Sequence, residues 1–390
     1  MNGWIWLLLL LPVAAAGGWF AHQAHARRSD SARVSKLSTT YFRGLNYLLN
    51  EQPDKAIEVF LEIAEVDKDT VETHFALGHL FRRRGEVDRA IRVHQNLVMR
   101  QNLSEEQRTH AVLELGEDYM RAGLLDRAET LFSDLVRADA AAPEALRHLI
   151  SIYQAEREWG KAIEHARRYE AATGEPMGRL VAQFHCELAE LARAQGDARA
   201  ARAALSEAHA ADANCIRAGL LEGQIELAAG HDDHAIRAFE RVAHHDPEYL
   251  PELLRPLLAC YERRSDRQRA REFLTAMVDR YPGVSPMLEL TRLVQLDEGR
   301  EAAAEFLTRE LRRRPSVRGQ AALIDLNLGD SHQAGREVLL TLKQLTDQLV
   351  AGTPTYRCTR CGFGAKAHHW QCPSCKNWGA IKPIHGVAGD

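Results

Sequence analysis

The chain has 390 residues, of which 45% are hydrophobic, 27% charged and 7% aromatic. This composition is typical of a globular protein and excludes a disordered or fibrous chain. There are 50 basic and 54 acidic residues, so the net charge of −4 gives no reason to expect a nucleic-acid partner, and we predict none. Length alone suggests two or three domains, but that rule does not apply to repeat arrays.

The first predicted element is an uncharged apolar segment at residues 4–20. As a helix it would reach about 26 Å, near the lower limit for crossing a bilayer. Four basic residues follow it in the linker 21–36 and none precedes it. This asymmetry favours an uncleaved transmembrane anchor at 1–20, with the rest of the chain in the cytoplasm. The alternative is a cleaved signal peptide, for which residues 24–26 offer a small-residue site.

Residues 37–350 repeat a pattern of small side chains. Alanines expected to open the second helix of each helical pair recur every 31 to 39 residues, close to the 34-residue tetratricopeptide period: Ala56, Ala90, Ala128, Ala162, Ala201, Ala235, Ala270, Ala303 and Ala334. Residues such as Gly116 and Gly223 are expected to face these alanines, while Phe132 and Phe239 fill the layer between neighbouring repeats. The predicted fold class is therefore all-α, a superhelix of about nine tetratricopeptide-like repeats whose last two are less regular.

A superhelix of this kind binds peptides or proteins on the concave face lined by the first helices of its repeats, and it brings no catalytic site of its own. We therefore predict a binding protein and not an enzyme. Ten residues are expected to contribute to this partner-binding groove: Phe75, His79, Arg82, His110, Glu117, Arg147, Glu190, Arg193, Arg217 and Arg255. Their charges are mixed, so no clamp for a terminal carboxylate is predicted.

Four of the seven cysteines lie close together near the end of the chain, in two C-x-x-C pairs separated by ten residues: Cys358, Cys361, Cys372 and Cys375. Four soft thiolates at this spacing predict one tetrahedral metal ion, either iron or zinc, and favour it over a pair of redox-active dithiols. His368 and His369 are interpreted as loop residues, since four sulfurs complete the coordination. The site has no open position, so its expected role is to fold a small domain at 354–390.

The other three cysteines, Cys186, Cys215 and Cys260, are scattered through the repeats and are expected to be buried thiols. Isolated thiols beside one metal-binding tetrad indicate a reducing compartment. The aromatic residues of the terminal domain, including Trp370 and Trp378, exceed what so small a domain needs. We therefore expect this domain to dock onto the last repeats.

This combination resembles the lipopolysaccharide assembly protein B family of Gram-negative bacteria. The resemblance is most specific at the end of the chain, in Tyr356-Arg357-Cys358, Cys372-Pro373-Ser374-Cys375 and Ile381-Lys382-Pro383-Ile384. It implies a rubredoxin-like domain whose metal ligands are the four clustered cysteines, with iron favoured. It also implies a single-pass inner-membrane adaptor that presents the committed-step deacetylase of lipid A synthesis to an FtsH-type membrane protease. Contact with an inner-membrane lipopolysaccharide sensor is implied as well.

Two other functions stay open at this point. The chain could be a membrane-tethered scaffold or chaperone for lipopolysaccharide assembly enzymes, without a role in proteolysis. An electron carrier is disfavoured because the ten residues between the two cysteine pairs are far fewer than in the loop of a rubredoxin.

Overall fold

The computed structural model describes residues 40–47, 49–50, 52–66, 71–328, 333–387 and 389–390. The predicted anchor at 1–20 and the linker at 21–36 lie outside these residues. Within the described part of the chain, no helix is both long enough and apolar enough to span a bilayer. The chain divides into two compact units, Met1–Arg157 and Glu158–Asp390.

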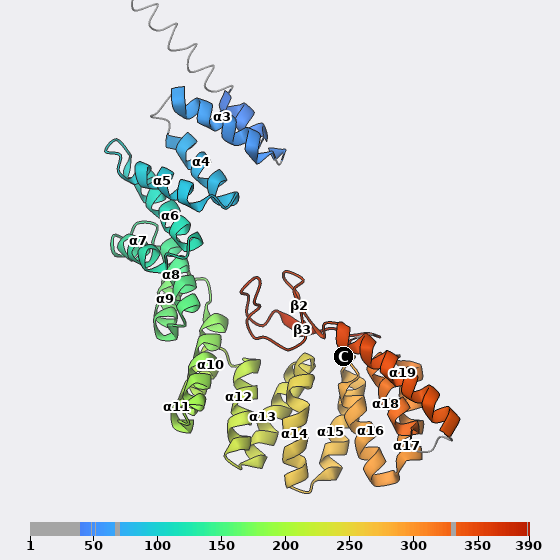
Figure 1. Ribbon diagram of the computed structural model, residues 1–390. Helices are drawn as coiled ribbons and strands as arrows, with labels where there is room; N and C mark the ends of the chain where they lie inside the picture. The colour runs from blue at the N-terminus through green and yellow to red at the C-terminus, as the bar shows by residue number, and fades with distance from the viewer. Residues whose placement is uncertain (1–39, 48, 51, 67–70, 329–332, 388) are drawn as a thin grey trace, which may run out of the picture. The chain divides into compact units, whose positions relative to one another are not determined.

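The first unit is built from helices that pack on their neighbours in the chain (Figure 1). After helical residues 40–47 they are α3 (Pro53–Val66), α4 (Val71–Arg83), α5 (Val87–Val98), α6 (Glu105–Arg121), α7 (Leu125–Arg137) and α8 (Ala142–Glu156). Local signals set their ends. Ser104 and Gln107 form a capping box that begins α6. Gly85 and Gly123 adopt φ angles of +83° and +75° in the turns that follow α4 and α6.

The second unit is a helical array that ends in a small sheet. Its helices are α9 (Trp159–Thr173), α10 (Gly178–Ala194), α11 (Ala198–Ala211), α12 (Ile216–Ala228), α13 (Asp232–His245), the 3₁₀ turn η1 (Pro247–Tyr249), α14 (Leu250–Arg263), α15 (Arg267–Arg280), α16 (Ser285–Glu298), α17 (Arg300–Arg313), α18 (Val317–Asn327) and α19 (Gln333–Gly352). Strands β1 (Tyr356–Cys358), β2 (Gly364–Ala365) and β3 (Ile381–Pro383) form an antiparallel sheet in the order β2-β1-β3.

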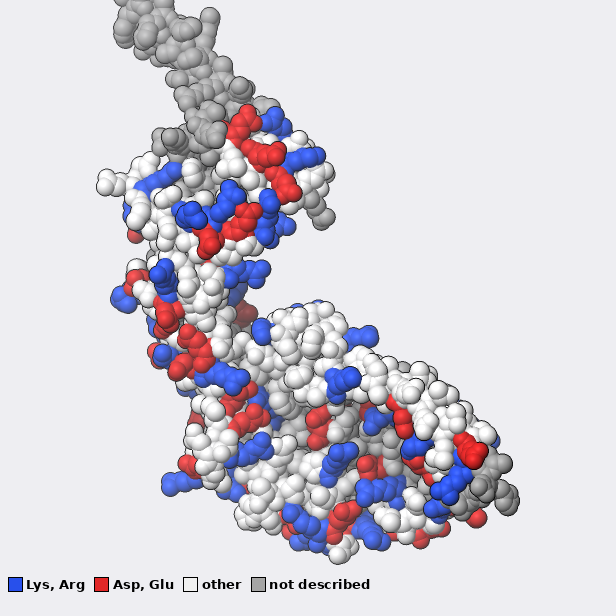
Figure 2. Space-filling model, viewed as in Figure 1, with Lys and Arg blue, Asp and Glu red and all other residues white. Residues whose placement is uncertain are grey.

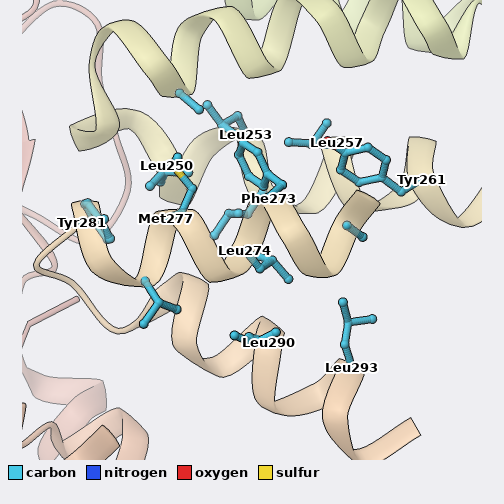
Figure 3. Packing of buried hydrophobic residues seen from close by; sticks show 14 of the residues in the cluster. Leu250, Leu253, Leu257, Tyr261, Phe273, Leu274, Met277, Tyr281, Leu290 and Leu293 are labelled. Carbon is cyan, nitrogen blue, oxygen red and sulfur yellow. The ribbon is translucent and has the colours of Figure 1, made fainter. Parts of the chain in front are cut away.

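A layered apolar core holds the helices of the second unit together. Figure 3 shows Leu253 and Leu257 of α14 beside Phe273 and Leu274 of α15, with Leu290 of α16 in the next layer. The first helices α10, α12, α14 and α16 each contact the next in this series. The core therefore aligns these helices side by side, and the terminal domain packs on the face they form.

The repeating alanines are packing residues, as predicted. Those whose side chains are described are at most 3% exposed: Ala56, Ala90, Ala128, Ala162, Ala201, Ala235, Ala270 and Ala303. The role expected of the glycines is wrong in one respect. A Cβ atom at Gly223 would lie 2.4 Å from the ring of Phe239, and one at Gly116 would lie 2.5 Å from that of Phe132. Each glycine makes room for a ring one turn after the alanine, inside its own helical pair.

Replacing Gly223 by Ala should therefore destabilise the second unit by about 1–3 kcal/mol, because the fully buried ring of Phe239 must shift to admit the new methyl group. Gly160→Ala in α9 is a matched control, since a Cβ there meets nothing within 4 Å. The control should be neutral or slightly stabilising, because Ala favours a helix over Gly. Urea unfolding of the full chain measures both effects, and equal stabilities would contradict this packing.

Candidate metal centre

The structure brings the four clustered cysteines together, with their Sγ atoms all within 4.8 Å of one another. The Sγ atoms of Cys358 and Cys375 are 3.7 Å apart, as are those of Cys361 and Cys372. A tetrahedral ion with metal–sulfur distances of about 2.3 Å requires sulfurs about 3.8 Å apart. The donor set therefore fits one tetrathiolate-bound metal ion, and both iron and zinc accept it.

The backbone around the two cysteine pairs holds the sulfurs in this arrangement. In the first pair, the amide of Gly362 donates to the carbonyl of Cys358 at 3.0 Å, and Gly362 has a φ of +77°. In the second pair, the amide of Lys376 donates to the carbonyl of Cys372 at 2.9 Å. These two tight turns are alike, and each directs a pair of thiols to the same point.

Hydrogen bonds also favour the thiolate form that a metal requires. The backbone amide of Asn377, together with its side-chain amide 3.3 Å from Sγ, lowers the pKa of Cys375 to about 6. Backbone amides of Cys361 and Arg360 lower the pKa of Cys358. Asn377 thus supports the site from outside the ligand set, and the sequence pattern did not single it out.

His368 has a different place, as expected for a residue that is not a ligand. Its ring packs edge-on against Tyr249, Tyr356 and Trp370, at centroid distances of 5.5, 5.7 and 4.5 Å. Burial, together with the charge of Lys382, lowers the pKa of His368 to about 4. The ring is therefore a neutral packing element between the metal-binding domain and the helices.

The metal-binding domain docks onto the helices through two tryptophans. Trp370 stacks on Tyr249 with centroids 5.4 Å apart and an interplanar angle of 15°. Trp378 meets the rings of Trp159 and Phe184 edge-on, at 6.4 and 6.3 Å. The predicted docking is confirmed, but it reaches back to α9 and α10 and is not limited to the last repeats.

Arg217 of α12 lies at the centre of this interface and is only 2% exposed. Its guanidinium binds Glu187 at 2.7 Å and Glu190 at 3.0 Å. It also lies 5.7 Å from the ring centroid of Trp370 and 5.5 Å from that of Trp378. Two indole rings and two carboxylates thus enclose one cation, an arrangement for which a planar guanidinium is better suited than an ammonium.

Polar contacts surround this aromatic centre. Lys382 of β3 binds Asp246 at 2.8 Å, and the hydroxyl of Tyr356 donates to Glu252 at 2.6 Å. The side chain of Asp390 accepts from the hydroxyl of Tyr281 at 2.6 Å. Asp390 also accepts hydrogen bonds from Ser285 and Arg318, and the amide of Val317 donates to the carbonyl of Val387 at 2.8 Å.

The four groove residues expected in the second unit therefore differ in their exposure and in what they contact. The prediction that Arg217 contributes to a partner-binding groove is wrong, because the metal-binding domain of the same chain covers this side chain. Glu190 holds Arg217, and Arg193 donates to Gln224 at 2.8 Å. Arg255 is exposed and lines a cavity of about 740 Å³ between α14, α16 and the metal-binding domain.

In the first unit, four of the predicted groove residues contact a partly buried charge cluster. His79 and His110 lie at its edge, 2.7 and 3.3 Å from Glu114, and Arg82 and Glu117 belong to its centre. Arg82 binds Glu114 at 2.6 Å, Asp118 at 2.9 Å and Glu117 at 3.0 Å. His148 lies 3.3 Å from Glu117. Arg82 and Glu117 thus hold α4, α6 and α8 together, and this contact accounts for their residue types. Arg147 of α8 is exposed.

Three of the predicted groove residues of the first unit share one pocket. Phe75, His79 and His110 line a cavity of about 540 Å³, together with Tyr41 and Glu72. The rings of Phe75 and His110 lie 4.4 Å apart. This pocket is therefore an open part of the predicted groove in the first unit.

The charge cluster should make the first unit acid-sensitive. Burial by itself raises the pKa of Glu114, but hydrogen bonds and charge from His79 and Arg82 outweigh it and lower the pKa from 4.5 to about 2. A carboxylate with a depressed folded-state pKa stabilises the fold above its unfolded pKa, and this contribution disappears as the pH falls from about 4.5 towards 2. The shift corresponds to about 3 kcal/mol.

We therefore expect Glu114→Gln to be less stable than the parent chain at pH 6 and to lose less stability between pH 6 and pH 3. Glu58→Gln, at an exposed position of α3, is the control and should keep the parental pH profile. Urea unfolding at both pH values measures this. A parental pH profile for Glu114→Gln would show that the Arg82 cluster does not stabilise the unit.

The three scattered cysteines are buried, as predicted, at no more than 5% exposure. Cys186 and Cys215 approach each other, with Sγ atoms 3.9 Å apart. Their shared hydrogen bond and burial raise the pKa of Cys186. Cys260 belongs to the core cluster of α14.

Two protein families and several individual proteins are similar to this chain. Residues 356–383 match the rubredoxin metal binding domain family, and residues 113–176 match the tetratricopeptide repeat family. The chain is 40% identical to lipopolysaccharide assembly protein B of Escherichia coli K12 over 98% of this chain and 99% of that protein. It is 33% identical to the Haemophilus influenzae protein of the same name, over 97% and 98%. A solved tetratricopeptide repeat protein from Parabacteroides merdae aligns with 71% of this chain and 98% of its own, at 15% identity and a TM-score of 0.33.

Proposed function

The chain belongs to the lipopolysaccharide assembly protein B family, and on this premise we propose that it is a non-enzymatic adaptor in lipopolysaccharide assembly. It presents the committed-step deacetylase of lipid A synthesis to an FtsH-type membrane protease and so limits lipopolysaccharide production. It is held at the bacterial inner membrane with its repeats and metal-binding domain in the cytoplasm, where an inner-membrane lipopolysaccharide sensor contacts it. The observation that carries the proposal is the identity to the two relatives over nearly the whole chain.

The metal centre supports an adaptor through its chemistry. A tetrathiolate ion has no open coordination position, so its contribution when bound is to fold the surrounding residues and not to activate water. Cys358, Cys361, Cys372 and Cys375 would hold this ion. The folded domain then presents Trp370 and Trp378 to the helices, which keeps α10, α12 and η1 in a fixed arrangement.

The pocket of the first unit is the surface that we assign to the protein partners. Phe75, His79 and His110 offer aromatic and hydrogen-bonding groups in a cavity of about 540 Å³. An aromatic centre with polar groups around it is typical of sites that dominate binding energy. Arg217 holds the same place in its repeat as His110, since each lies six residues before the glycine that makes room for a ring in its helical pair. In the second unit, the metal-binding domain covers Arg217. Partner capture is thus assigned to α4 and α6.

The test is the lifetime of the deacetylase in cells. Depleting this protein, or replacing it with the Phe75→Ala/His110→Ala variant, should lengthen the half-life of the deacetylase several-fold in a chase after protein synthesis is stopped. Leu124→Ala, at an exposed apolar position away from the pocket, should restore the normal half-life. An unchanged half-life on depletion, with lipopolysaccharide still altered, would favour the scaffold or chaperone role. If depletion lengthens the half-life but the Phe75→Ala/His110→Ala variant does not, the partner binds outside this pocket.

A further inference from the structure

The last helix of the array, α19, turns its more apolar side to solvent. The side that packs against α18 contains Lys343, which binds Asp325, and the buried Thr346. The exposed stripe consists of Val338, Leu342, Leu345 and Leu349, which are 60%, 43%, 54% and 66% exposed. In Figure 2 the surface over α19 is mostly uncharged. The end helix of a repeat array ordinarily has a polar outer side, so this stripe requires a partner.

The spacing of the stripe indicates another helix. Its residues are separated by four, three and four positions, which is the spacing of a and d residues along a two-helix seam. We propose that this stripe, the α19 seam, pairs with the α19 seam of a second copy of the chain. The pairing makes a homodimer that neither the family resemblance nor the proposed adaptor function requires.

The charge of the surrounding positions favours a second copy. On its solvent side the α19 seam is flanked by Thr341 and Gln348, both uncharged. Two identical faces can therefore meet without bringing like charges together. A helix that lies on an anionic membrane would carry Lys or Arg along this border. The basic residues of α19 are Arg336 and Lys343. At 3.6 residues per turn both fall on the other side of the helix, and Lys343 already binds Asp325.

An antiparallel pairing about a two-fold axis satisfies every residue of the stripe. With the axis between Leu342 and Leu345, these two residues meet each other's counterparts, and Val338 meets Leu349 of the second copy. Thr341 of each copy then lies beside Gln348 of the other. The seam from 338 to 349 is about 17 Å long, at a rise of 1.5 Å per residue. So short an interface predicts a reversible dimer whose population depends on concentration.

Sedimentation equilibrium of the full chain, in a density-matched detergent, tests the proposal. We expect a monomer–dimer equilibrium that Leu345→Glu weakens at least tenfold. Leu340→Glu is the matched control, because Leu340 is 42% exposed but lies on the opposite side of the same helix, and it should leave the equilibrium unchanged. A parent chain that stays monomeric up to about 100 µM would overturn the proposal. The proposal would also be overturned if Leu345→Glu and Leu340→Glu changed the dissociation constant equally, or if Leu345→Glu left it unchanged.

A pair of double variants tests the antiparallel register without changing the apolar stripe. Thr341→Glu/Gln348→Lys places opposite charges together twice across the two-fold axis, so it should dimerise at least as tightly as the parent chain. Thr341→Glu/Gln348→Glu places like charges together and should dimerise at least tenfold more weakly at low salt. Circular dichroism checks that both variants keep the parental helix content. If the two variants have the same dissociation constant, the register proposed here is wrong.

Discussion

Replacing Cys358 and Cys361 by serine should reduce the bound metal from one ion per chain to none and unfold residues 354–390. The bound metal should supply most of the folding free energy of this domain, since structural zinc stabilises small domains by about 10–16 kcal/mol at neutral pH. The described core of this domain beyond its cysteines is small, with Ile381, Ala365 and Ala380 as its most buried apolar residues. Without the ion, little burial is left to keep the domain folded.

Metal analysis of the purified full chain measures the first effect, and limited proteolysis near residue 353 measures the second. Cys260→Ser is the matched control, because Cys260 is a buried free thiol in α14, away from the metal site. The control should keep its metal and resist cleavage. A Cys358→Ser/Cys361→Ser variant that is metal-free and still resists cleavage would show that the ion is not needed for folding.

Replacing Arg217 by Ala should destabilise the second unit by about 3–5 kcal/mol and release the metal-binding domain from the helices. The substitution leaves Glu187 and Glu190 next to each other without their cation, and it removes the group between Trp370 and Trp378. Arg217→Lys should restore only part of the loss, since an ammonium cannot stack flat on an indole ring.

Urea unfolding and tryptophan fluorescence report on this interface. Release should shift the emission to longer wavelength, because Trp378 would leave its contacts with Trp159 and Phe184. Arg193→Ala is the control, as Arg193 is exposed one turn further along α10 than Glu190, and it should cost less than about 0.5 kcal/mol. An Arg217→Ala variant with parental stability and emission would mean that the cation does not hold the domain.

The periodic features of the fold could be predicted from the sequence because each arises from local packing. A small residue must recur wherever two helices of a pair cross, so the alanine spacing identified the helical pairs, including those with altered positions. Thr291 stands where other repeats have glycine, and its hydroxyl donates to the carbonyl of Met287 at 2.8 Å, which satisfies the buried oxygen within its own helix. The four metal ligands could also be predicted, because two residues between the cysteines of each pair let both sulfurs face one ion.

The interface between the metal-binding domain and the helices could not be located in this way. The repeat spacing predicts that Arg217 and Glu190 lie on the inner face, but no periodicity shows whether such a face meets another protein or a later segment of the same chain. Trp159 and Phe184 gave no signal, since aromatic residues are common inside helical repeats. Their partner, Trp378, comes from the far end of the sequence, so only tertiary structure connects them.

The central claim is that the bound metal keeps the terminal domain folded against the inner helices of the second unit. Hydrogen–deuterium exchange of the full chain, before and after metal removal by a chelator, tests it most directly. Metal removal should expose the amides of residues 354–390 and that of Val317, whose hydrogen bond to Val387 crosses the interface. The amides of α4 to α6 in the first unit should be unaffected. Unchanged protection at Val317 and in residues 354–390 after complete metal loss would contradict the account.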